Sequence, residues 1–170
     1  PAFHPYMSLI SGLAWDHHEI FPTQEDYNEA FKQFLNQSQW KVLWRKDVDQ
    51  LALSPDDSYT ILDEQDTHTA DIKLTGEYNR RDAWLVAQGV HELTKEPLDK
   101  LLDLLSSFPG VSRRFEKIVD NLYTDYAHTP EKIIGAMSVA KETAAPTSQK
   151  IVVVYEPLTN RRMHHTRDQH

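Results

Sequence analysis

The sequence predicts an α/β protein, and three observations support that fold class. Short apolar runs such as "YMSLI" (6–10) end abruptly in polar residues, as buried strands that lead into loops do. Segments in which apolar residues recur at helical spacing separate these runs. A continuous β-branched run, "KIVVVYE" (150–156), is typical of a parallel strand that is covered on both faces. Strands and helices that alternate in this way form layered α/β folds.

The composition indicates a globular protein and argues against several classes of partner. The chain has 170 residues, of which 39% are hydrophobic and 26% are charged. Its net charge of −8 argues against binding to nucleic acid or to an anionic membrane, because most of the surface would repel phosphate groups. No apolar run approaches the roughly 20 residues that a membrane-spanning helix needs. The lack of cysteine removes disulfides and thiolate metal sites, which fits a cytoplasmic protein.

The first half of the chain contains the elements of a small sheet with helices. A strand is expected near 6–10, and a helix is expected after Thr23, whose hydroxyl is suited to cap it. The segment "WKVLWRKD" (40–47) is expected to be a strand that leads into a short helix or turn. The segments "SYTILDE" (58–64) and "TADIKLTG" (69–76) are expected to be two further short strands.

Two amphipathic helices are expected next, followed by a linker. The first helix spans about 79–93, and its expected apolar stripe is Ala83, Trp84, Val86, Ala87 and Val90. The second spans about 97–107, with a proline in its first turn. The segment "FPGVSRRFE" is typical of a linker, so we expect one domain in residues 1–108 and another in residues 109–170.

The second domain is expected to contain a βαβ unit. Two short strands, "RFEKIV" (114–119) and "NLYTDYA" (121–127), precede a helix for which Thr129 and Pro130 are a suitable N-cap and first residue. The run 150–156 would then be the last strand, reached by a right-handed crossover.

Polar side chains fall at the carboxyl ends of these expected strands, where ligands of α/β sheets bind. They are Asp125, His128 and Glu156. Asp125 and His128 also precede the N-terminus of a helix, whose free N–H groups favour an anion such as a phosphate. Alternatively, Asp125 caps a turn and His128 is a solvated loop residue.

Carboxylate and imidazole groups follow the first strand in "WDHHE" (15–19). Asp16, His17 and Glu19 are candidate metal ligands, and the histidines favour a transition metal over Mg²⁺. A polar loop is the alternative, because no fixed histidine spacing is present. Arg113 and Arg114 lie at the inferred hinge, where a guanidinium could bind phosphate or carboxylate. The segment "TNRRMHH" (159–165) could hold an anion after the last strand or begin a solvated helix.

The order of these segments resembles the Mur ligases, which are ATP-dependent amide-forming enzymes of peptidoglycan synthesis. The likeness is greatest to the branch that adds L-alanine to UDP-N-acetylmuramate. The segment 9–35 resembles the central domain's strand, metal loop and helix, and "GEYNRRDA" resembles the family's Gly-Arg-His-Asn segment. "FPGVSRRFE" is similar to the interdomain hinge, "TDYAHTPEKI" to the opening of the C-terminal domain, and "VVVYEPLTNRR" to the strand after it. The fold implied is the end of a central domain followed by an incomplete Rossmann-like C-terminal domain.

The resemblance implies ATP and Mg²⁺ as cofactors, and it implies roles for the residues before the hinge. His17 matches a histidine that binds the second Mg²⁺, with Asp16 and Glu19 beside it. Asn79 matches an asparagine of the nucleotide site. Asp82 stands where the family usually has a second asparagine, and we carry it as a further candidate at that site.

After the hinge, the resemblance implies a group of residues that act on the nucleotide. Arg114 matches an arginine that reaches ATP phosphate, and Asp125 matches the acid that helps to close the C-terminal domain over the nucleotide. His128 belongs to the same motif. The implied reaction phosphorylates a substrate carboxylate with ATP, and an amine then attacks the acyl phosphate. The implied partners are a UDP-N-acetylmuramate-type nucleotide sugar and an amino acid or peptide.

The chain departs from the family pattern in ways that define an expectation about its extent. The Gly-Lys-Thr phosphate loop is absent from these 170 residues, as is a domain for the nucleotide sugar, and the strands within 40–76 are abbreviated. We therefore expect the latter part of a central domain and the first half of a C-terminal domain, from a parent that is a ligase. The fragment alone is expected to be inactive.

Two other functions are compatible with parts of the sequence. One is a metal-dependent phosphoesterase with an Asp-His-His motif, although that chemistry needs further aspartates upstream. The other is a non-catalytic binding module with a Mur-like fold. The sequence also leaves open the amino acid added, because "DYAHTP" is similar to the branch that adds the third residue of the peptide.

Overall fold

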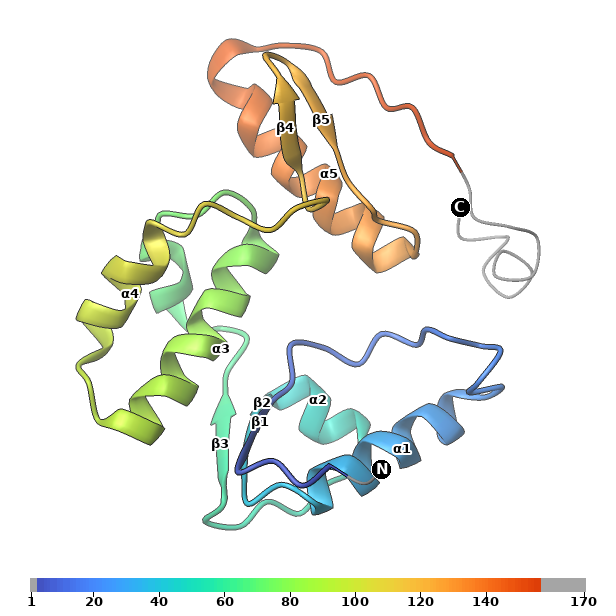
Figure 1. Ribbon diagram of the computed structural model, residues 1–170, viewed down its shortest axis with the longest axis vertical. Helices are drawn as coiled ribbons and strands as arrows, with labels where there is room; N and C mark the ends of the chain where they lie inside the picture. Colours follow the sequence, from blue (N-terminus) through green and yellow to red (C-terminus); the bar gives the residue numbers. More distant parts are fainter. Residues whose placement is uncertain (1–2, 157–170) are drawn as a thin grey trace.

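The computed structural model describes residues 3–156 of the chain and contains a parallel three-stranded sheet (Figure 1). Its strands are β1 (Met7–Leu9), β2 (Trp40–Trp44) and β3 (Tyr59–Leu62), in the order β1-β2-β3. Both pairings are parallel. The predicted α/β class and these three strands are confirmed, and the sheet places the carboxyl ends of its strands along one edge.

Helices connect the three strands. Helix α1 (Gln24–Asn36) lies between β1 and β2, and the Thr23 hydroxyl accepts a hydrogen bond from the Asp26 N–H at 3.1 Å. The predicted cap is therefore confirmed. Helix α2 (Arg45–Gln50) begins where β2 ends and leads toward β3. These connections are βαβ crossovers, and they lie in the first half of the chain.

The strand predicted for residues 69–76 is wrong. Thr67–Asp71 form a short 3-10 helix, η1. The Asp66 carboxylate caps it by accepting a hydrogen bond from the His68 N–H at 3.0 Å, and the Thr69 hydroxyl donates to the Asp66 carbonyl oxygen at 3.0 Å. These local side-chain bonds to the backbone favour a turn over a strand.

Two helices follow η1 and pack together. Helix α3 (Glu77–Thr94) begins two residues before its predicted start, and α4 (Leu98–Ser106) lies within its predicted range. The predicted stripe of α3 is wrong at Val86, which is 39% exposed. Leu85 is buried in its place, because the sheet lies against that side of α3.

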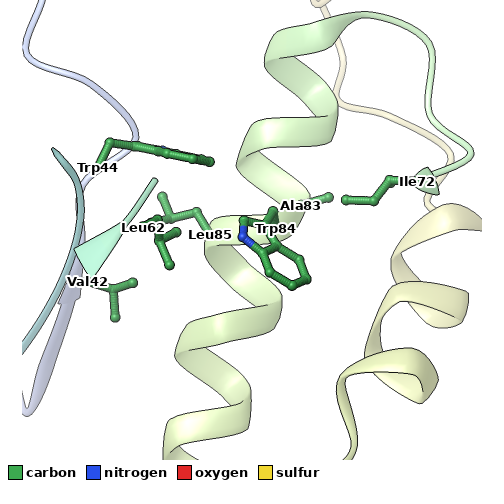
Figure 2. Close-up of a cluster of buried hydrophobic side chains, with 7 residues drawn as sticks. All are labelled: Val42, Trp44, Leu62, Ile72, Ala83, Trp84 and Leu85. Atoms are coloured by element: carbon green, nitrogen blue, oxygen red, sulfur yellow. The ribbon is translucent and has the colours of Figure 1, made fainter. Parts of the chain in front are cut away.

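The sheet is covered on both faces by apolar side chains. Figure 2 shows the cluster on one face of the sheet, in which Val42, Trp44, Leu62 and Leu85 lie between the strands and α3, while Ile72 lies on the other side of α3. Ala83 and Trp84 complete the cluster. A second cluster lies on the opposite face and consists of Ile10, Leu13, Leu35, Leu43, Val48 and Leu51. Successive residues of β2 alternate between the two clusters, as the pleat requires. Trp44 and Trp84 are both buried in the first cluster, and Trp84 thereby confirms its place in the predicted apolar stripe of α3.

After residue 106 the chain forms a hairpin and a helix. Strands β4 (Glu116–Val119) and β5 (Leu122–Thr124) are antiparallel, and α5 (Pro130–Ala144) follows, with a 3-10 turn, η2 (Ala145–Thr147), after it. Both strands and the helix were predicted. Thr129 precedes α5 as expected, but its hydroxyl makes no capping hydrogen bond.

The βαβ unit predicted for the second half is wrong within the described residues. Residues 151–156 form no strand, and β5 pairs with β4 in the antiparallel sense. A parallel strand needs a neighbour for its backbone hydrogen bonds, and none lies beside this run in the described part of the chain. Val152 and Val154 are accordingly 85% and 94% exposed.

Helix α5 packs against the beginning of α3 (Figure 1). Gly76, which precedes α3, is buried against the Val139 side chain and has a φ of +92°. Gly135 lies against the Tyr78 ring, where an added Cβ would come within 3.2 Å of a ring carbon. Small residues at both contacts let the two backbones approach closely. Among the described residues, no helix is both long and apolar enough to cross a membrane.

We predict that Gly76→Ala lowers the free energy of unfolding by about 2 kcal/mol or more. The added methyl group would overlap the Val139 side chain, and alanine is strained at a φ of +92°. Urea denaturation followed by circular dichroism measures the change. Gly12→Ala is the matched control, because nothing lies within 4 Å of that position and its φ is not positive. Equal stability of the two variants would contradict the close contact between α5 and Gly76.

Candidate functional site

The loop after β1 meets the beginning of α5 through the Asp16 carboxylate. Lys132 Nζ donates a hydrogen bond to Asp16 Oδ2 at 2.7 Å, and His128 Nε2 lies 3.6 Å from the same oxygen. Lys132 Nζ and His128 Nε2 are 3.3 Å apart. The side chains of Asp16 and His128 are largely buried, at 16% and 12% exposure. Two motifs that lie more than one hundred residues apart in the sequence are therefore in direct contact.

The surroundings of Asp16 stabilise its negative charge. Burial by itself would raise the pKa of Asp16, but the Lys132 hydrogen bond, the His17 N–H and the charges of Lys132 and His17 outweigh it. Together they lower the pKa to about 2. Asp16 is consequently a carboxylate at any neutral pH, and Lys132 is its counterion.

His17 and Glu19 lie beside Asp16 in the sequence but form a separate pair. His17 Nδ1 is 3.5 Å from Glu19 Oε1, and both side chains are about half exposed. His17 has a φ of 57°, and its N–H donates to Asp16 Oδ1 at 2.8 Å. Nowhere in residues 3–156 do three or more histidine, aspartate or glutamate side chains converge as a metal would require. The three predicted ligands thus do not fit a metal by themselves as they are arranged here, and the metal assignment stays a prediction.

Asp125 connects the linker to the end of β5. Its Oδ2 accepts a hydrogen bond from the Phe115 N–H at 2.7 Å, and its Oδ1 accepts one from the Ala127 N–H at 2.6 Å. Phe115 has a φ of 46°, so this carboxylate stabilises a backbone turn that is otherwise unfavourable. Asp125 therefore caps a turn, as one of the two interpretations of the sequence expected. Its side chain is exposed.

The remaining predicted residues lie apart from Asp16. Arg114 is exposed, and its guanidinium makes no ion pair or hydrogen bond within the described part of the chain.

Asn79 is exposed in the first turn of α3, where its side-chain amide donates to the Thr75 carbonyl oxygen at 2.7 Å. Asp82 is exposed on the same helix, and Glu156 is exposed in a segment without secondary structure. The basic segment 159–165 lies outside the described residues.

Three charged residues at the α5 contacts were missed by the sequence reasoning: Lys132, Arg80 and Glu142. Arg80 forms a two-pronged ion pair with Glu142, with nitrogen–oxygen distances of 2.9 and 3.2 Å. The Gly76 N–H also donates to Glu142, at 2.9 Å. The spacing of Lys132, Gly135, Val139 and Glu142 places all four on one face of a helix, and that periodicity was the available signal.

Asp47 is a buried carboxylate at the carboxyl end of the sheet. It is 1% exposed, and its Oδ2 has no hydrogen-bond partner in the described structure. Burial raises the pKa of Asp47 to about 6, with the charges of Lys46 and Arg81 opposing this and that of Glu64 adding to it. Asp47 borders a hollow of about 410 Å³ between the loop after β1, α2 and the first turn of α5.

Comparisons with known proteins find ligases of the family that the sequence resembles. The chain is 27% identical to the UDP-N-acetylmuramate–L-alanine ligase of Lactobacillus acidophilus over 188 aligned positions, which cover 93% of this chain and 42% of that protein. It is 28% identical to the ligase of the same name from Streptococcus agalactiae, over 92% of this chain and 42% of that protein. The resemblance to Mur ligases is confirmed.

A shorter match at higher identity points to the same Mur ligase. It is 30% identical to the UDP-N-acetylmuramate–L-alanine ligase of Mycolicibacterium smegmatis, over 52% of this chain and 22% of that protein. No family model matches the chain. The chain spans about 42% of the length of the first two Mur ligases. The alignment with the first has 188 positions, more than the 170 residues of the chain, so it includes positions at which this chain has no residue.

We predict that Asp47→Asn removes a pH dependence of stability. Because burial raises the folded-state pKa to about 6, the native protein binds the proton more tightly than the unfolded chain. The wild-type free energy of unfolding should therefore fall between about pH 4 and pH 6 and remain lower above pH 6. Asparagine cannot ionise, so its free energy of unfolding should not fall in this way. The difference in free energy of unfolding between the variant and wild type should therefore grow by about 2 kcal/mol from pH 4 to pH 8.

Urea denaturation at several pH values measures this difference. Asp49→Asn is the matched control, since Asp49 is exposed in the same helix. If Asp47→Asn and Asp49→Asn show the same pH dependence, Asp47 is not the buried titrating group.

Proposed function

We propose that the chain is part of an ATP-dependent Mur ligase that joins an amino acid, L-alanine, to UDP-N-acetylmuramate in peptidoglycan synthesis. Residues 1–108 would be the latter part of the central ATP-binding domain, and residues 109–170 the first half of the C-terminal domain. The ligases that the chain resembles carry L-alanine in their names, and the similarity extends over 93% of this chain. Such an enzyme would act in the cytoplasm, where its nucleotide substrates are.

One observation carries this proposal: the loop after β1 and the opening of α5 form a single cluster. Asp16 lies before the linker and His128 and Lys132 lie after it, and Asp16 Oδ2 is within 3.6 Å of both. A ligase of this kind needs groups from both sides of its hinge around one reacting centre. A binding module would not require a largely buried charged cluster at that place.

The proposed chemistry has two steps. The γ-phosphoryl group of ATP is transferred to a carboxylate of the nucleotide sugar, and the amine of the amino acid then displaces phosphate from the acyl phosphate to form an amide. Negative charge builds on phosphoryl oxygens during transfer, so a guanidinium at that place stabilises the transition state. Arg114 is the proposed source, because its guanidinium is exposed and makes no ion pair among residues 3–156.

The remaining roles follow the same proposal. Asp125 and His128 would face the nucleotide from the C-terminal side, and Asn79 and Asp82 from α3. Asp125 is held by two backbone N–H groups, which fixes its orientation. The proposed Mg²⁺ roles of His17, Asp16 and Glu19 rest on the resemblance to Mur ligases alone, because these three side chains do not converge on one metal position among residues 3–156.

The function can be tested on the complete product of the gene that encodes this chain. We expect ADP release that requires UDP-N-acetylmuramate and is fastest with L-alanine among the amino acids. Arg114→Ala should lower kcat by about 10²-fold or more, since one electrostatic contact to a transition state contributes on that order. The 170-residue chain alone should release no ADP, because it contains no Gly-Lys-Thr phosphate loop.

Two other results would decide against the proposal, and a third would correct its specificity. Hydrolysis of a phosphodiester in Mn²⁺ that His17→Ala abolishes would support the phosphoesterase alternative. A complete gene product that binds no ATP in calorimetry would support a non-catalytic module. Ligation with a different amino acid or a peptide would retain the ligase and correct its specificity.

A further inference from the structure

Glu142 of α5 binds the stretch of backbone that leads into α3. Its Oε2 accepts a hydrogen bond from the Gly76 N–H at 2.9 Å and another from Arg80 Nη1 at 2.9 Å. Arg80 Nη1 also donates to the Leu74 carbonyl oxygen at 2.9 Å. Glu142 and Arg80 together therefore hold the chain on both sides of Thr75.

The peptide group between Thr75 and Gly76 is bound by a side chain at each end. Its N–H, on Gly76, donates to Glu142, and its carbonyl oxygen, on Thr75, accepts a hydrogen bond from Asn79 Nδ2 at 2.7 Å. A trans peptide group is planar, and its N–H and C=O point in opposite directions. The bond to Glu142 therefore also fixes the direction of the carbonyl oxygen that holds Asn79.

The backbone at this place does not fix that peptide group by itself. Rotation of the peptide changes the φ of Gly76, and glycine has more freedom in this angle than other residues have. Gly76 is buried, so its N–H needs a hydrogen-bond partner, which Glu142 provides. Without the Glu142 carboxylate, the direction of the Thr75 carbonyl group would be much less sharply determined.

The Thr75 carbonyl oxygen in turn decides how the Asn79 amide is oriented. A carbonyl oxygen only accepts hydrogen bonds, so the amide turns its NH₂ group toward Thr75 and its Oδ1 away from it. Asn79 is exposed, and its amide forms no other hydrogen bond within residues 3–156. Asn79 therefore presents an oriented acceptor, Oδ1, and one further N–H donor to a ligand.

We propose that Glu142 is a positioning residue, which orients the Asn79 amide for the nucleotide through the Thr75–Gly76 peptide group. The inference rests on the proposed role of Asn79 at the nucleotide site. Because Glu142 follows the linker and Asn79 precedes it, part of the nucleotide affinity depends on the contact between α5 and α3. Arg80 acts one step further away, because it pairs with both oxygens of Glu142 and keeps that carboxylate in place.

The first test follows the Asn79 side-chain amide by NMR in the 170-residue chain. The two amide proton signals are assigned by their loss in Asn79→Ala. Glu142→Ala should move both signals toward the positions of a solvated amide and speed their exchange with water, because the Thr75 carbonyl group is no longer held. Glu131→Ala is the matched control, since it removes an exposed carboxylate from the same helix, and it should leave both signals in place.

A second variant keeps this test decisive if Glu142→Ala does not fold. Glutamine at position 142 retains one acceptor oxygen but places an NH₂ group opposite the Arg80 guanidinium, where both groups are donors. Glu142→Gln should therefore move the Asn79 signals in the same direction by a smaller amount. If the folded variants move these signals no more than Glu131→Ala does, the proposal is wrong.

The second test measures steady-state kinetics of the complete gene product. Glu142→Ala should raise the KM for ATP about fivefold, as the loss of one well-placed hydrogen bond does, and leave kcat within about twofold of wild type. A purely structural defect would instead lower kcat by reducing the folded fraction. In an Asn79→Ala background, Glu142→Ala should have no further effect on KM, because the two residues act as one unit. An equal rise in KM in both backgrounds would overturn the proposal.

The two tests separate this inference from the proposed function. The NMR measurement requires no ATP, nucleotide sugar or amino acid. If the complete gene product shows no ligation while Glu142→Ala moves the Asn79 signals, the proposed function fails and the link between Glu142 and Asn79 stands. ATP-dependent ligation with independent effects of Glu142→Ala and Asn79→Ala on KM gives the reverse result.

Discussion

The burial of β2 on both faces is the constraint on which the rest of the structure depends. Val42 and Trp44 face α3, while Leu43 faces α1 and α2, and all three are at most 1% exposed. A strand enclosed in this way needs parallel neighbours and helices on either side, which βαβ crossovers supply. The crossovers place the loop after β1, the start of α2 and the end of β3 along one edge. Every charged group of the candidate site before the linker lies at this edge or at the beginning of α3.

The second half of the chain depends on that edge for its position. Helix α5 has one buried residue, Val139, and it also contacts residues 7–106 through Gly135 and through two ion pairs. Charged contacts of this kind form and break at little cost when they are partly exposed, whereas an apolar interface would hold the two parts permanently. A docked helix with a charged interface is thus suited to a protein whose parts move relative to each other. This property agrees with a ligase in which groups on both sides of a hinge meet around one substrate.

Much of the fold could be predicted because its signals are local. Thr23 and the proline before α4 indicate helix starts, and the alternation within β2 indicates a strand between two apolar layers. Predictions failed where a neighbour or a local hydrogen bond decided the outcome. Asp66 and Thr69 form backbone hydrogen bonds that favour η1 over a strand. The run 151–156 has strand composition, but strand structure also requires a partner for its backbone groups.

The sequence by itself determined the α/β class, the first three strands, the main helices and the Mur ligase motifs in their order. Only the tertiary structure decided that Asp16 pairs with Lys132 and His128, and that Glu142 pairs with Arg80. Residues more than sixty positions apart leave no periodic signal in one sequence, so their contact depends on how helices and sheet pack. The burial of Asp47 was likewise invisible in the sequence, because an aspartate beside a lysine at a strand end is usually solvated. The sequence therefore indicated which chemical groups the protein carries, and the packing of α5 on the sheet edge determined which of them act on one another.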